Sequence, residues 1–251
     1  PAEDGIRDDI SCLVGSEMCI RDSHPAEHDA VVRSLKVLLS TAELCADSRV
    51  RRIEERFGLT HVDVYACVEG FFSLPCPCGA KHVLSAYHVE VVDDELQRIG
   101  ETGTGRFVFT NLLKRSTPMV RYLLDDLVTI VEGDCPYGFA RNIVPHGRYE
   151  LTVRTGSGRI GARHVEQAIF ECGLFGDYRL VIEDGGAQLT LESYGDSDRM
   201  PELEDVLGLP VHLDRVAYGA LTDYRAVRAS KPILRLDDRR SESDQSVPRH
   251  L

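Results

Sequence analysis

The chain has 251 residues, of which 43% are hydrophobic and 28% are charged, and its formal net charge is −12 at pH 7. A chain of this charge is poorly suited to bind a nucleic-acid backbone or an anionic membrane surface, because both are negative themselves. In addition, no apolar run approaches the about 20 residues that span a bilayer. From the charge and the absence of such a run in the sequence, we expect neither a nucleic-acid partner nor a membrane partner.

Residues 1–23 differ in origin from the rest of the chain. Ala2–Asp8 and Leu13–Ser23 match the in-frame translations of two oligonucleotide adapters used in sequencing libraries, and Asp9–Cys12 between them fits a short sample index. We set such a segment aside before considering the fold, and expect the native sequence to start near His24 and to be incomplete on that side. Without the segment, the eight cysteines become six and the net charge becomes about −8.

The next part of the chain alternates between helical and strand-like patterns. Asp29–Leu44 is helical at first and then strand-like. Ser48–Phe57 has apolar residues spaced for one buried helix face, and Gly58 directly after it is typical of a helix end. Val62–Tyr65 predicts a short strand. A β-rich stretch follows, with strands expected at Tyr87–Val92, Gly105–Asn111 and Val128–Glu132.

The sequence changes character near Gly147, and we place a domain boundary at Arg148–Leu151. Beyond it the pattern predicts a compact α+β unit of fewer than about 100 residues. Its expected elements are helices at Ala162–Phe170 and Met200–Leu207 and strands at Tyr178–Glu183, Gln188–Ser193 and Val211–Ala217. The expected domains are therefore residues 24–148 and 149–240, followed by a polar tail, 241–251, that we expect to be disordered.

Five short motifs occur along the chain in the order that one known family would have them. They are Ser40–Glu43, Val64–Glu69, the segment from Gly105 to Asp126, His146–Arg148 and Ser230–Arg235. Together they resemble the motifs of phenylacetate–coenzyme A ligases, which are members of the adenylate-forming superfamily. The resemblance covers about residues 37–240.

The resemblance implies an α/β fold. The chain would hold the incomplete C-terminal part of the large adenylate-forming domain, which is β-rich with helices, and a small α+β lid domain. The implied reaction joins ATP and a small carboxylic acid into an acyl adenylate and then transfers the acyl group to a thiol such as coenzyme A. The Ser/Thr/Gly-rich phosphate loop is not found in the sequence, so we expect this fragment alone to be inactive.

The resemblance also assigns residues to the ATP site. Tyr65 would stack on adenine, Asp126 would accept hydrogen bonds from the ribose hydroxyls, and Arg148 would lie near the ribose and phosphate. Ala42 and Glu43 belong to the same ATP-binding set. The ordinary alternative for Tyr65 is core packing, which is the usual role of a tyrosine at the end of a strand.

Two further residues would act in catalysis. Glu69 would hold Mg²⁺, a hard cation that prefers carboxylate oxygen. Lys231 is the only lysine after Lys114, and it would reach the α-phosphate from the small domain and neutralise charge as the carboxylate attacks. The alternative for Lys231 is a solvated surface position.

Cysteine and histidine residues form a second constellation, in which Cys76, Cys78 and His82 share one short segment and Cys135 lies in another. Thiolates and a neutral imidazole are the ligands that zinc prefers, and this pattern indicates metal chemistry in the reducing cytoplasm. Relatives have similar turns, but Tyr137 stands where they carry a cysteine. Cys76 and Cys78 together would restore four protein ligands, so we expect a structural zinc ion. The alternative is reduced cysteines in tight turns.

Departures from the family pattern leave the acceptor open. Leu123 and Leu124 stand where relatives carry arginine and threonine, Glu150 lies where paired aspartates are usual, and Gly156–Arg159 lacks the asparagine of the acceptor loop. Coenzyme A, another thiol or an amine remains as the acceptor. The alternative function is a catalytically inactive, zinc-stabilised relative that acts as a binding or assembly module. The acidic charge disfavours a zinc module that binds nucleic acid.

Overall fold

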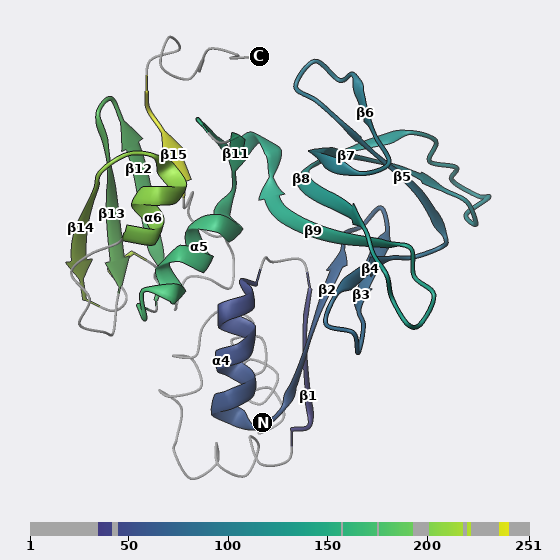
Figure 1. Ribbon diagram of the computed structural model, residues 1–251, viewed down its shortest axis with the longest axis horizontal. Helices are drawn as coiled ribbons and strands as arrows, with labels where there is room; N and C mark the ends of the chain where they lie inside the picture. The colour runs from purple at the N-terminus through teal and green to yellow at the C-terminus, as the bar shows by residue number, and fades with distance from the viewer. Residues whose placement is uncertain are drawn as a thin grey trace, which may run out of the picture.

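Three β-sheets, of nine, four and two strands, organise the described part of the chain (Figure 1). The structure is a computed structural model, and it describes residues 35–41, 45–156, 158–174, 176–192, 201–217, 220–221 and 236–240. The adapter-like segment, the helical start expected within Asp29–Leu44 and the tail 241–251 lie outside these residues.

The described residues before position 149, which we call the large lobe, form a nine-stranded sheet and one helix. The elements are β1 (Val37–Thr41), α4 (Asp47–Phe57), β2 (Thr60–Ala66), β3 (Phe71–Pro75), β4 (Lys81–Val83), β5 (Tyr87–Val92), β6 (Arg98–Gly100), β7 (Gly103–Asn111), β8 (Tyr122–Glu132) and β9 (Arg141–Arg148). The strand order is β1-β2-β3-β4-β9-β8-β7-β5-β6.

Helix α4 is the crossover between the parallel strands β1 and β2, whereas every other pair in this sheet is antiparallel. Parallel neighbours need such a connection, because the chain must return to the same end of the sheet. The helix ends at Gly58, which has φ 62° and donates its N–H to the Glu54 carbonyl at 2.8 Å. The predicted helix and its glycine stop are thus confirmed.

An aromatic cluster forms the centre of the large lobe. Phe107 and Phe109 lie two residues apart on β7 and therefore point to the same face of the sheet. Phe72 of β3 packs against both, with ring centroids 5.0 and 4.7 Å away, and all three side chains are fully buried. The core is therefore built from strands that lie far apart in the sequence.

The described residues from position 149 onwards form the small lobe. The elements are η1 (Tyr149–Leu151), β10 (Val153–Thr155), β11 (Gly158–Ile160), α5 (Ala162–Glu171), β12 (Tyr178–Glu183), β13 (Gly186–Glu192), α6 (Pro201–Leu207), β14 (Val211–Val216) and β15 (Leu236–Asp238). Strands β12 and β13 form an antiparallel hairpin, and β14 and β15 flank it in parallel pairs. Helices α5 and α6 lie over this sheet (Figure 1) and contribute to its core.

The small lobe begins directly against the large lobe. Strand β9 leads through η1 into the β10–β11 hairpin, and Gly161 precedes α5. A Cβ atom at Gly161 would lie 2.2 Å from the carbonyl oxygen of His146 on β9. Because no side chain fits in that space, glycine allows the start of α5 to approach the backbone of β9.

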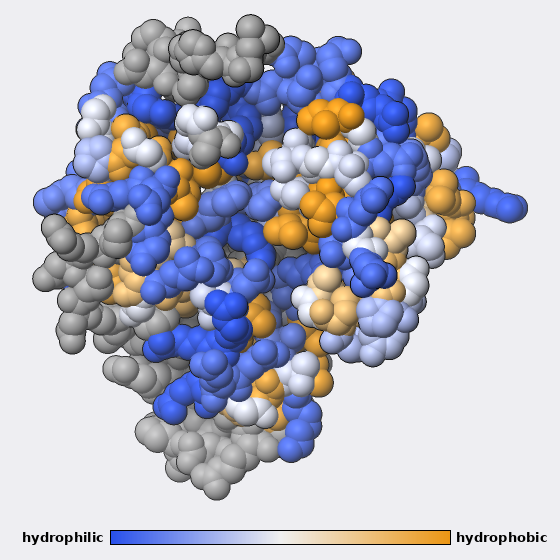
Figure 2. All heavy atoms as spheres, viewed as in Figure 1, coloured by the Kyte–Doolittle hydropathy of each residue, from blue (hydrophilic) through white to orange (hydrophobic). Residues whose placement is uncertain are grey.

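The sequence patterns predicted most of these elements. Strands β5 and β12 and helix α5 lie where they were expected, to within one residue. The strands that were not predicted are β3, β4, β6, β9, β10, β11 and β15. No helix in the described ranges is both long and apolar enough to cross a membrane. The face in Figure 2 is mostly hydrophilic, with hydrophobic residues in separate small groups.

Candidate functional site

A buried carboxylate on one strand of the large sheet is contacted by side chains from two other strands. Asp126 of β8 accepts a hydrogen bond from the Tyr65 hydroxyl of β2 at 2.7 Å, and the Arg148 guanidinium of β9 lies 3.5 Å from its other oxygen. Asp126 and Arg148 are direct partners in the register of β8 and β9. Antiparallel pairing therefore brings together two residues that are far apart in the sequence.

Burial governs the charge of this group. Asp126 is 8% exposed, and its burial raises the pKa of the carboxyl above the ordinary value, although Tyr65 and Arg148 act in the opposite direction. Burial and the Asp126 charge raise the pKa of the Tyr65 hydroxyl well above 10. Tyr65 therefore stays a hydrogen-bond donor, and Asp126 is oriented as an acceptor.

The ring of Tyr65 lies against the core. Its centroid is 5.3 Å from that of Phe72 and 5.9 Å from that of Phe107. This packing fixes the ring, so the hydroxyl is directed at Asp126 by the core itself. The side chain thus has the core contacts that a tyrosine at a strand end usually has, together with a polar contact.

Glu69 lies in the bend between β2 and β3. Its pKa is lowered, first by a hydrogen bond from the Cys67 thiol and further by the Tyr122 hydroxyl and the Arg148 charge. The Tyr122 hydroxyl lies 3.5 Å from Glu69. Burial and the contact with Glu69 raise the pKa of Cys67 to about 11. Glu69 is thus an ionised, partly accessible carboxylate that could hold a hard cation.

The expected ATP site includes further residues whose positions the structure does not describe. Ala42, Glu43 and Lys231 lie outside the described residues. The structure therefore brings together Tyr65, Asp126 and Arg148, with Glu69 near them.

The predicted metal ligands form a cluster beside the connections between strands of the large sheet. The ligand atoms of Cys76, Cys78, His82 and Cys135 all lie within 4.8 Å of one another, and none of these cysteines is in a disulfide. Cys76 and Cys78 come from the turn between β3 and β4, His82 from β4, and Cys135 from the connection between β8 and β9. Strand β4 pairs with β9, which brings the two segments side by side.

The spacing of the sulfur atoms fits a tetrahedral zinc ion. Sulfur ligands at about 2.3 Å from zinc lie about 3.8 Å from one another in a tetrahedron. The Cys135 sulfur lies 3.8 Å from that of Cys76 and 3.7 Å from that of Cys78. The Cys78 sulfur lies 3.1 Å from His82 Nε2, slightly closer than a bound ion would allow. The donor set and these distances therefore fit zinc, with a small adjustment at His82.

The His82 ring is held in place by its surroundings. It is buried and stacks on Phe139, with centroids 4.8 Å apart and planes at 6°. Its Nε2 atom faces Cys78, whereas Nδ1 has no hydrogen-bond partner among the described residues. A metal-bound histidine commonly donates its second ring N–H to a carboxylate or carbonyl. Since the described residues offer no such partner to His82, its ring is oriented by packing on Phe139.

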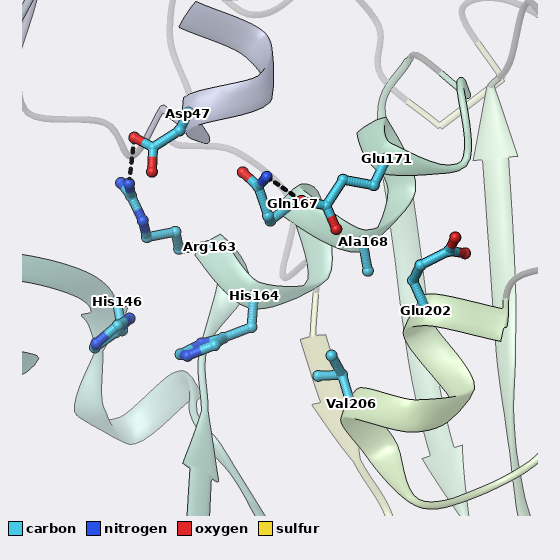
Figure 3. Close-up of a pocket in the computed structure, with 9 residues that line it drawn as sticks. All are labelled: Asp47, His146, Arg163, His164, Gln167, Ala168, Glu171, Glu202 and Val206. Atoms are coloured by element: carbon cyan, nitrogen blue, oxygen red, sulfur yellow. Dashed lines mark hydrogen bonds and ion pairs between the residues drawn. The ribbon is translucent and has the colours of Figure 1, made fainter.

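A pocket of about 210 Å³ lies at the junction of the lobes (Figure 3). The imidazoles of His146 on β9 and His164 on α5 stack there, with ring centroids 4.4 Å apart. His146 Nε2 lies 2.8 Å from the Thr129 hydroxyl, and His164 Nδ1 accepts the Gly161 N–H at 3.1 Å. Sequence reasoning placed His146 in a motif but did not predict its contact with His164.

No protein-family model matches the chain, and no curated protein matches its sequence. Solved structures match its fold. A 2-hydroxyisobutyryl-CoA ligase in the postadenylation state with R3-HIB-AMP matches with a TM-score of 0.69 and 20% identity, over 92% of this chain and 53% of that chain. An anthranilate CoA ligase, AuaEII, with anthranoyl-AMP matches with a TM-score of 0.53 and 14% identity, over 82% and 44%.

The amide bond synthetase McbA from Marinactinospora thermotolerans matches with a TM-score of 0.54 and 18% identity, over 77% of this chain and 46% of that chain. At the level of fold, the neighbours of this chain are thus acyl- and aryl-CoA ligases and related enzymes of the adenylate-forming superfamily. The chain has their mixed α/β, strand-rich fold and spans about half the length of these structures. The predicted fold class is confirmed.

Proposed function

We propose that the chain is the C-terminal part of an ATP-dependent, AMP-forming acid ligase similar to phenylacetate–coenzyme A ligases. Its parent would activate a small carboxylic acid and transfer the acyl group to a thiol such as coenzyme A. One observation carries the proposal: Tyr65, Asp126 and Arg148, which the motifs assign to the nucleotide, lie in one polar group. The similar 2-hydroxyisobutyryl-CoA ligase binds an acyl adenylate and CoA, which supports the same reaction class.

In this proposal Asp126 binds the ribose. A buried carboxylate is a strong acceptor for two neighbouring hydroxyl groups, because little water competes for it. The Tyr65 hydroxyl fixes the orientation of the carboxylate, and the tyrosine ring borders the adenine. Arg148 reaches the same group from β9 and contributes positive charge near the α-phosphate. Ala42 and Glu43 would complete the nucleotide site.

The chemistry follows in two displacements. An oxygen of the substrate carboxylate attacks the α-phosphorus of ATP and pyrophosphate leaves; the sulfur of the acceptor thiolate then attacks the acyl carbon and AMP leaves. Lys231 would neutralise the charge that develops on the α-phosphate. Glu69 would hold Mg²⁺, which supplies further positive charge at the phosphates when bound.

We also propose that Cys76, Cys78, His82 and Cys135 bind a structural zinc ion in a cytoplasmic protein. With four protein ligands the ion has no open position for a substrate, so it would stabilise the fold and take no part in the reaction. The distances from the Cys135 sulfur to those of Cys76 and Cys78, which match a tetrahedral site, support this role.

Because the similar structures are about twice as long as the part that this chain matches, the test uses the complete parent protein. Exchange of radiolabelled pyrophosphate into ATP is measured with a panel of small carboxylic acids. We expect Asp126→Asn to lower kcat/KM for ATP at least tenfold, because a hydrogen bond to a charged acceptor contributes about 1.5–3 kcal/mol. The control is Asp125→Asn, at the neighbouring position on the same strand, where the carboxylate contacts Arg106 at 3.4 Å instead of Tyr65 and Arg148.

The alternative, a catalytically inactive zinc-stabilised relative, predicts a different result. The packing of the Tyr65 ring against Phe72 and Phe107 favours it, because that ring already has the contacts of a structural residue. Zinc-loaded parent protein that exchanges no pyrophosphate with any acid would overturn the ligase proposal and leave a binding or assembly module. We propose that the present chain alone shows no exchange in either case.

A further inference from the structure

Tyr149, the first residue after β9, lies between two arginine side chains. The guanidinium carbon of Arg106 on β7 lies 4.6 Å from the centre of the Tyr149 ring, and that of Arg159 on β11 lies 4.4 Å from it. Cations over an aromatic face are attracted by its electron density. The ring therefore joins a strand of the large lobe to the hairpin with which the small lobe begins.

Asp94 of the large lobe accepts hydrogen bonds from three residues of the small lobe. The Tyr149 hydroxyl and the Arg154 guanidinium each donate to it. Arg159 donates from two nitrogens, at 3.2 and 3.0 Å. One carboxylate thus binds η1, β10 and β11 at once, and two guanidinium groups share its single negative charge.

The turn that carries Asp94 is itself well fixed. It joins β5 to β6, and the Asp93 carboxylate accepts the Gln97 N–H at 2.8 Å. Backbone hydrogen bonds between Asp93 and Gln97, and from Leu96 to Asp93, close the same turn. Asp94 is therefore held in place before the small lobe contacts it, so little conformational freedom is lost when the contact forms.

A second, separate contact joins the lobes at α4 and α5. Arg163 pairs with Asp47 at 2.6 Å and donates to the Cys45 carbonyl at 3.1 Å. The Ser48 hydroxyl and N–H donate to Gln167. None of these residues contacts the group around Asp94, so the two contacts can open independently.

We propose that Asp94, with Tyr149, Arg154 and Arg159, is a latch that holds the segment between β9 and α5 against the large lobe. Its release would free the chain between β9 and α5 while the contact between α4 and α5 still holds. The latch is a property of the folded chain, so the proposal goes beyond the proposed function and does not depend on it. Any movement of the β10–β11 hairpin away from Asp94 must first break the hydrogen bonds that Arg154 and Arg159 donate to it.

The test measures amide hydrogen exchange, by mass spectrometry, in the 251-residue chain and two variants. Asp94→Asn removes the charge that the two arginines share, and we expect exchange in residues 149–156 to rise about tenfold with little change in residues 163–171. Asp47→Asn is the matched control, because it removes an equal charge from the other contact. We expect that variant to increase exchange at residues 163–171 and not at 149–156.

A third variant, Tyr149→Phe, separates the latch from a general loss of stability. It keeps the ring between the two guanidinium groups and removes only the hydroxyl that Asp94 accepts, so we expect a rise in exchange of about threefold in the same residues. The latch is overturned if Asp94→Asn leaves exchange in residues 149–156 unchanged. It is also overturned if exchange rises equally over both segments.

Discussion

His146 and His164 come from different lobes, and their rings stack in a largely buried place. Burial, followed by the influence of His164 and Arg163, lowers the pKa of His146 to about 3. The unfolded chain binds the same proton near pH 6.5. The folded state binds this proton much more weakly than the unfolded chain does. The stability that depends on neutral His146 is therefore present above about pH 6.5 and is lost as the pH falls towards 3.

We expect His146→Gln to remove much of this acid sensitivity. One proton bound only by the unfolded chain lowers the free energy of unfolding by up to about 1.4 kcal/mol for each pH unit. Between about pH 6 and pH 4, the free energy of unfolding of the variant should therefore fall less steeply than that of the wild type, by about 1 kcal/mol per unit. Urea denaturation at several pH values measures both slopes.

The control for this prediction is His212→Gln, because the His212 side chain on β14 is 76% exposed. We expect that variant to keep the wild-type slope. If His146→Gln and the wild type showed the same slope, the neutral state of His146 would not contribute to stability.

The sequence indicated some of the residues that lie together in the structure and not others, for physical reasons. Asp126 and Arg148 lie in motifs, and hairpin pairing of β8 with β9 places them opposite each other. Asp94 looked like any acidic residue in a polar turn. Its partners lie 55 to 65 positions away in the sequence, on the other lobe. A local sequence pattern does not predict such a contact between a turn and a distant hairpin.

At the scale of elements, β9 shows why a strand can escape prediction. Its sequence contains Pro145 and Gly147, which ordinarily argue against a strand in the middle of a sheet. In the structure Pro145 lies opposite Val128, where the register between β8 and β9 shifts. An irregularity of this kind tolerates the missing N–H. Strand β5, in which apolar and polar residues largely alternate, was predicted to the residue.

The close approach of α5 to β9 depends on Gly161. We expect Gly161→Ala to lower the free energy of unfolding by about 1–3 kcal/mol, as overpacking usually does. The added methyl group would lie 2.2 Å from the His146 carbonyl oxygen, so α5 and β9 would have to move apart. The control is Gly156→Ala, because no atom lies within 4 Å of a Cβ at that position. Chemical denaturation of both variants tests the prediction, and equal stabilities would contradict it.

At the scale of the whole molecule, the two lobes have separate hydrophobic cores. One cluster is built from residues between 72 and 143 and the other from residues between 153 and 236. The cysteine and histidine cluster lies in the large lobe only. A bound metal ion would therefore stabilise one core directly and leave the other unchanged.

We expect removal of zinc by a chelator to lower the unfolding temperature of the large lobe by about 10 °C or more. A ligand at a free concentration of about 100 times its dissociation constant raises the free energy of unfolding by about 2.7 kcal/mol, and the chelator would remove this contribution. The small lobe should keep its unfolding temperature. Scanning calorimetry with and without chelator measures both transitions. Cys135→Ser should respond little to the chelator, and a wild type that does not respond at all would contradict a zinc site.

The cysteine and histidine cluster also has a consequence for the folding of the large sheet. Cys76 and Cys135 are 59 positions apart, and a bond through an ion would close a loop that contains β4 to β8. In the chain-entropy account, a closure of that length removes about 4 kcal/mol of freedom from the unfolded chain. Cys76, Cys78 and His82 offer an incomplete site early, and Cys135 completes it only when β8 and β9 have paired in the correct register. Tight binding of the ion would thus select the correctly aligned sheet over chains in which a strand has slipped.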